Sequence, residues 1–143
     1  MGVTPDEFYD ARFHAIVPMG FCFPGYDDNK SDMPPRRECR ATWHDAVFAT
    51  MPQLELVIAI GAHAQAYHLG ERRERTMTGT VAEWRNHLGR NERPRVLPIP
   101  HPSWRNTGWL RANPWFERDV IPVLRTQVRG YIDAHDHCAS GEE

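Results

Sequence analysis

Short runs of apolar residues stand out against a mostly polar chain, at residues 14–21, 54–60 and 95–99. The run at 54–60 is near-continuous rather than alternating, which is typical of a strand buried on both faces of a parallel sheet. The run at 95–99 predicts a second strand of this kind. The run at 14–21 predicts a third, although Pro18 restricts it to a sheet edge or makes its end irregular.

Helical patterns lie between these runs. Thr4 and Glu7 form a capping box with Pro5 at the first helical position, which predicts a short N-terminal helix. Further helices are expected at 41–50, with Trp43, Val47 and Phe48 on its apolar face, at about 62–69 after Gly61, and from a second capping box, Thr80 and Glu83, to Gly89. Alternating helices and strands favour an α/β fold with a small parallel sheet.

The last helix carries the clearest periodicity. Asn113 and Pro114 read as its cap and first position, and Pro122 is expected to kink it. An apolar stripe recurs every four residues along it: Phe116, Val120, Leu124, Val128 and Ile132. Residues 134–143 read as a flexible tail, so that residues 1–133 are expected to form one domain.

Composition narrows the class of protein. No apolar run is long enough to span a bilayer, and there is no signal peptide, so the expectation is a soluble cytoplasmic protein. The formal net charge of −2 gives no global basic field, and three cysteines are too few for a disulfide framework. Two arginine clusters, 36–40 and 72–75, form either a phosphate-facing patch or solvated surface.

Candidate chemistry concentrates after the strand at 95–99. His101 lies between Pro100 and Pro102, and proline fixes its own backbone and restrains the residue before it. The strand therefore ends in a stiff loop that presents His101, Ser103, Trp104, Arg105 and Asn106. Such a loop suits polar groups that must be held against a ligand. Trp104 either wedges into a ligand or packs on the core.

This His-Pro-Ser loop resembles the second signature of the uracil-DNA glycosylase superfamily. Other segments resemble bacterial members related to the iron–sulfur type, in the same order along residues 2–132: Met19–Gly25, Asp32–Cys39, Ile58–Tyr67 and Asn113–Glu117. The resemblance implies a three-layer α/β fold and hydrolysis of the bond between deoxyribose and uracil, or a related damaged base, in DNA. It also implies an N-terminal strand and Gly-rich water-positioning loop that this sequence does not show, and we expect an upstream in-frame extension to encode them.

The resemblance assigns roles to particular residues. His101 would stabilise the negative charge on the departing base, as an oxyanion hole does. Relatives read the base with an asparagine near the end of the second strand, where this chain has backbone groups near Gly20. Contacts to DNA would come from the loop itself: Pro102, Ser103, Trp104, Arg105 and Asn106.

Cys22 and Cys39 correspond, by the same resemblance, to two of the four ligands of a [4Fe–4S] cluster. Two thiolates do not hold such a cluster. We therefore expect the cluster in a full-length relative and no cofactor in this chain alone, where the two cysteines are equally compatible with free thiols.

The leading interpretation is thus a glycosylase of base-excision repair whose partner is DNA, with protein partners unidentified. The alternative is a truncated, inactive remnant that binds DNA weakly. A third reading is a metal-dependent hydrolase using scattered histidines, including the His135-Asp136-His137-Cys138 segment.

Overall fold

Residues 1–136 are described in the computed structural model, except for the side chain of Arg105. They form two compact units, one of Val17–Pro102 and one of Met1–Ile16 together with Ser103–Glu143. Residues 137–143, which include most of the predicted tail, lie outside the described part.

A two-stranded parallel sheet organises the Val17–Pro102 unit. Strands β1 (Leu56–Ile60) and β2 (Arg95–Ile99) pair in register, with Leu56 opposite Arg95 and Ile60 opposite Ile99. The α/β class and the parallel pairing are confirmed. β1 is less enclosed than its apolar sequence predicts, because Val57 and Ala59 are buried whereas Ile60 is exposed.

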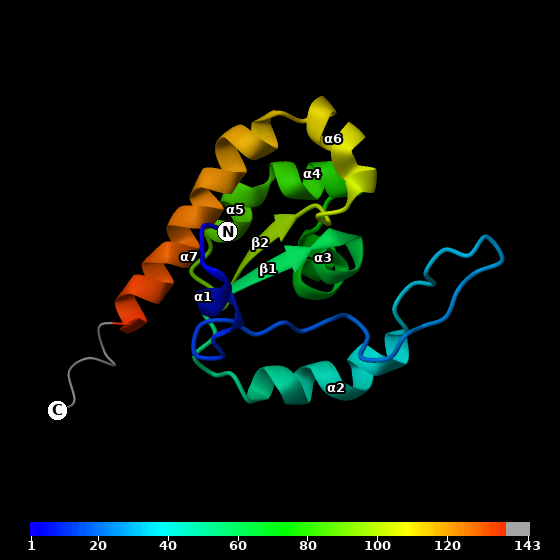
Figure 1. The fold of residues 1–143 in the computed structure, drawn as a ribbon, viewed down its shortest axis with the longest axis horizontal. Coiled ribbons are helices and arrows are strands. Elements are labelled where there is room, and N and C mark those ends of the chain that lie inside the picture. Colours follow the sequence, from blue (N-terminus) through cyan, green and yellow to red (C-terminus); the bar gives the residue numbers. More distant parts are fainter. Residues whose placement is uncertain (137–143) are drawn as a thin grey trace. The chain divides into compact units, whose positions relative to one another are not determined.

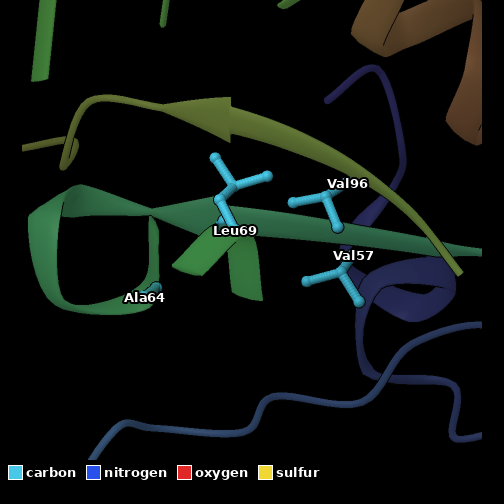
Figure 2. Packing of buried hydrophobic residues seen from close by; sticks show 5 residues of the cluster. Val57, Ala64, Leu69 and Val96 are labelled. Atoms are coloured by element: carbon cyan, nitrogen blue, oxygen red, sulfur yellow. The ribbon is translucent and has the colours of Figure 1, made fainter. Parts of the chain in front are cut away.

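Helices of the same unit lie before and between the strands (Figure 1). Helix α2 (Arg37–Ala49) precedes β1. The connection to β2 contains α3 (Gly61–Leu69), a 3₁₀ turn η1 (Gly70–Arg72), α4 (Met77–Ala82) and α5 (Trp84–Leu88). Figure 2 shows the side chains of Val57, Leu69 and Val96 gathered beside the two strands. Their burial, with that of Ala59 and Ala64, holds α3 on the sheet.

The predicted capping box at Thr80 and Glu83 is wrong. Thr76 caps α4 instead, its hydroxyl accepting from the amide of Gly79 at 3.0 Å. Thr80 is buried, and its hydroxyl accepts from the amide of Glu74 at 3.0 Å. Glu83 interrupts the expected single helix, which is therefore split into α4 and α5.

The other unit is helical. The predicted capping box forms at α1 (Pro5–Tyr9), where Thr4 and Glu7 bond reciprocally at 2.8 and 3.2 Å. After a 3₁₀ turn η2 (Trp104–Asn106) come α6 (Thr107–Ala112), a π-helical turn η3 (Phe116–Val120) and α7 (Ile121–Asp136). An ion pair of 2.7 Å between Glu7 and Arg129 joins α1 to α7.

Pro122 deforms the last helix as expected, and the deformation takes the form of a π turn. The amide of Ile121 donates to the carbonyl of Phe116, five residues back. Pro122 has no N–H to continue an ordinary ladder, so the wider turn accommodates it. All five residues of the predicted apolar stripe are buried: Phe116, Val120, Leu124, Val128 and Ile132. Asn113, predicted as the N-terminal cap of this helix, instead occupies the C-cap position of α6.

The predicted strand at 14–21 does not form. The amide of His14 donates to Asp10 at 3.0 Å, which turns the chain before the run begins. Pro18 lacks an N–H, and its carbonyl accepts from Nε2 of His44 at 3.0 Å rather than from a neighbouring strand.

The apolar face predicted for α2 is shifted by one residue. Trp43 is exposed, and the adjacent His44 is fully buried in its place. The His44 ring lies edge-on to those of Phe21, Phe48 and Tyr67, with centroid distances of 5.6, 6.0 and 4.9 Å. His44 therefore ties the segment around Pro18 to α2 and α3.

His87 in α5 is buried with neither ring nitrogen hydrogen-bonded. Burial lowers the pKa of His87, and the nearby Arg90 and Arg72 lower it further. We expect His87→Leu to raise the free energy of unfolding by about 1–3 kcal/mol, because it removes unpaired buried polar atoms. Urea unfolding of both proteins measures the change. The exposed His63, changed to Leu as the control, is expected to give no such gain.

Burial, followed by the proximity of His44, lowers the pKa of His68 to about 4 from 6.5. The unfolded chain then binds a proton at this residue near pH 6.5 while the folded chain does not, so stability falls as the pH drops from 6.5 towards 4. We expect His68→Gln to flatten this part of the profile, as measured by urea midpoints across the range. Equal slopes for the two proteins would contradict the assignment.

Candidate active site

The carboxyl ends of β1 and β2 place Gly61 beside His101. β1 runs directly into α3 at Gly61, and β2 runs into Pro100 and His101. Because the strands are parallel and in register, both segments leave the sheet at the same end. Ligand sites in α/β sheets form at this end of the strands.

Gly61 has a backbone conformation that favours glycine and lies close to His101. Its φ is +78°, a conformation that glycine adopts without strain. A Cβ added at this position would lie 3.5 Å from Cβ and 3.9 Å from Cδ2 of His101. Gly61 therefore lies next to His101, with room for no more than a methyl group in ordinary contact between them.

Gln65 fixes the end of β2 from α3. Its side chain is 2 % exposed, and Nε2 donates to the carbonyl of Ile99 at 2.9 Å. Ile99 lies two residues before His101, and Pro100 between them is buried. The bond and the buried proline restrain the backbone from which His101 projects.

His101 itself is exposed, as is Pro102. The residue is thus not enclosed in the core of its unit. Its backbone is fixed and its side chain reaches solvent, which is the arrangement a binding or catalytic imidazole needs.

The rest of the predicted loop belongs to the other unit. Ser103 and Asn106 close a 3₁₀ turn through an amide-to-carbonyl bond of 2.9 Å, and both are half-buried. Thr107 donates its hydroxyl proton to the carbonyl of Trp104 at 2.7 Å. Trp104 is 81 % exposed, so of its two predicted placements packing on the core is wrong.

Gly20 makes a close approach of a kind the sequence did not indicate. A Cβ at this position would lie 3.2 Å from Cβ of Pro35 and 3.8 Å from the amide nitrogen of Arg36. The glycine thus closes the base of the loop that ends at α2. Its predicted contact with a nucleobase stays a prediction.

The two candidate cluster ligands carry free thiols. Cys22 is exposed and Cys39 is half-buried. Within residues 1–136, no group of three or more His, Cys, Asp or Glu side chains is placed to hold a metal ion. Two thiols do not fit a [4Fe–4S] cluster, which takes four, so we derive no chemical step through it. In the predicted His135–Cys138 segment, only His135 and Asp136 fall within the described residues.

Gly61, Gln65 and His44 are the residues that the sequence did not identify as site components. Gln65 had one available signal, since it is an amide within a helix otherwise rich in alanine. The bond from His44 to Pro18 joins residues 26 positions apart, and local patterns do not show such contacts.

The family model of the uracil DNA glycosylase superfamily matches residues 1–125 of this chain. The match covers most of the sequence, and the chain belongs to that superfamily. Membership indicates a DNA glycosylase-like role with DNA as the partner. Among the described residues, no helix is long and apolar enough to cross a membrane.

Gln65→Leu is expected to lower the free energy of unfolding by about 1–3 kcal/mol, because the Ile99 carbonyl loses its buried donor. Urea unfolding at neutral pH measures the loss. Gln53→Leu is the matched control, since Gln53 is exposed, and is expected to change stability by less than about 0.5 kcal/mol. Equal effects of the two substitutions would show that the Gln65 bond carries no weight.

Proposed function

We propose that this member of the uracil DNA glycosylase superfamily hydrolyses the N-glycosidic bond of uracil, or of a related damaged base, in DNA. The observation that carries the proposal is His101, an exposed residue at the carboxyl end of β2, next to Gly61 and on a backbone restrained by Gln65. Superfamily membership supplies the class of reaction.

The reaction requires a fixed hydrogen-bond donor near the base. A glycosylase extrudes the target nucleotide from the duplex before it reaches the glycosidic bond. Cleavage of that bond leaves negative charge on the base. A ring nitrogen of His101 donating to this charge lowers the barrier, and a donor held in place before the reaction costs no reorganisation during it.

The residues after His101 are assigned to DNA. Ser103 offers a hydroxyl to a phosphate oxygen, and Arg105 offers its positive charge. The backbone amide of Asn106 donates a hydrogen bond to the carbonyl of Ser103 and so closes the turn. Pro102 restricts the backbone between His101 and this turn. Trp104, exposed on this turn, is suited to occupy the space that an extruded base leaves in the stack.

Gly20 is assigned to the base. Gly20 has no side chain of its own to hold a ligand away from its backbone, and His44 restrains the nearby Pro18. Backbone N–H and C=O groups there would read the edge of the base in place of an amide side chain. Cys22 and Cys39 have no step in this reaction.

His101→Ala is expected to slow release of uracil by about 10²–10³-fold, the usual cost of removing a donor to a developing negative charge. Release from uracil-containing single-stranded and duplex oligonucleotides measures the rate. His135→Ala is the matched control, because this exposed histidine on α7 hydrogen-bonds the carbonyl of Tyr131 on its own helix. Unchanged release by His101→Ala, or no release by the parent chain, would refute the proposal.

A further inference from the structure

A second surface of the Val17–Pro102 unit gathers exposed apolar rings. It is the aromatic hairpin, residues 20–36, which projects from the N-terminal end of α2 (Figure 1). Among the described residues, the exposed large apolar side chains include four from this segment: Phe21, Phe23, Tyr26 and Met33. Soluble proteins rarely leave such rings together in water unless they bind something.

The hairpin is an ordered structure. Tyr26 and Asp32 form an antiparallel bridge, and the amide of Met33 donates to the carbonyl of Gly25 at 3.0 Å. The carboxylate of Asp27 accepts from the amides of Asn29 and Ser31 at 2.9 and 2.8 Å, which fixes the tip. The rings are therefore presented on a defined backbone.

The ring geometry leaves aromatic faces available. Phe23 and Tyr26 meet edge to face, with centroids 4.9 Å apart, yet they remain 63 % and 64 % exposed. An edge-to-face pair covers little of either ring. Phe21 contacts the buried His44 and so anchors the base of the hairpin to α2.

Two arginines lie where the hairpin meets α2. Arg36 is the last residue of the hairpin and Arg37 is the first of α2, and both are exposed. Neither forms an ion pair with a carboxylate among the described residues, whereas other arginines of the chain do, including Arg12, Arg72 and Arg129. Close packing of Gly20 on Pro35 brings the two ends of the hairpin together at this point.

The acidic residues restrict where an anionic ligand would lie. Asp27 and Asp28 lie at the tip of the hairpin, and Asp32 lies just below it in the bridge with Tyr26. A polyanion is repelled there and attracted at Arg36 and Arg37. A strand would therefore cross the base and side of the hairpin, along the rings, and avoid the tip.

We propose that the aromatic hairpin, together with Arg36 and Arg37, is a binding surface for unpaired DNA, in which bases stack on Phe23 and Tyr26 and the arginines contact phosphates. Exposed rings on the same surface as arginines are the combination that binds single strands without sequence preference. The inference rests on the proposed function for the identity of the partner. It adds a second contact on the strand besides the His101 loop.

The first arm of the test measures stacking. Binding of a fluorescent oligothymidylate of about 16 nucleotides, which contains no uracil, is followed by anisotropy. F23A/Y26A is expected to weaken binding by about tenfold or more, with little change in the dependence on salt. Tyr9→Ala is the matched control, since Tyr9 is an exposed ring on α1 outside the surface. Circular dichroism establishes that each variant is folded.

The second arm measures phosphate contacts. R36Q/R37Q is expected to reduce the slope of log affinity against log salt by about 1.4, because each phosphate contact on a single strand contributes about 0.7. R90Q/R93Q removes the same charge from exposed arginines of the same unit that are paired with Glu92 and Glu55, and is expected to leave the slope unchanged. An equal reduction in both variants would reduce the effect to net charge and overturn the proposal.

Two further outcomes would overturn it. One is that F23A/Y26A and R36Q/R37Q both bind the oligonucleotide as tightly as the parent chain does, or that the parent chain does not bind it. The other is self-association of the parent chain in sedimentation that F23A/Y26A abolishes while DNA binding persists, which would make the hairpin a protein interface. Because the probe contains no uracil, its binding does not depend on base release. The binding experiment therefore tests the hairpin proposal separately from the proposed glycosylase activity.

Discussion

The hydrogen bond from Gln65 to the carbonyl of Ile99 is the contact on which the candidate active site depends. It ties the first helix after β1 to the last residue of β2, and so fixes two strand ends relative to each other. His101 follows within two residues and lies next to Gly61, the first residue of the same helix. A short sheet of two strands thereby holds one imidazole on a restrained backbone, although the ring itself stays exposed.

The Val17–Pro102 unit holds the His101 backbone and the aromatic hairpin with different kinds of interaction. The His101 backbone is held by a buried amide and a buried proline. The aromatic hairpin is held mainly by its own backbone bonds and by Phe21 packing on His44. A donor that stabilises developing charge must not move, whereas stacked rings tolerate any base that lies on them.

Local sequence patterns predicted the parts of the fold that depend on local physics. The capping box at Thr4 needs only neighbours in the chain, while the strand at 95–99 and the buried stripe of the last helix are visible in the spacing of their own apolar residues. The strand at 14–21 failed because its apolar content said nothing of where Pro18 sends its carbonyl, which is to His44 on another element. The histidine of the candidate site was evident from its flanking prolines. Gly61 and Gln65 were not, because their role exists only once β1 and β2 are paired.

Pro98 removes one backbone hydrogen-bond donor from the side of β2 that faces away from β1. The amide of Arg95 bonds towards the β1 side, at the carbonyl of Glu55, so alternate residues of β2 face away from β1 and Pro98 is among them. Proline has no amide proton to offer on that outer side. A ladder on the outer side of β2 would therefore lack a bond at its fourth residue, which disfavours a further strand there. Among the described residues β2 is thus an end strand of the sheet, and the imidazole follows directly from it.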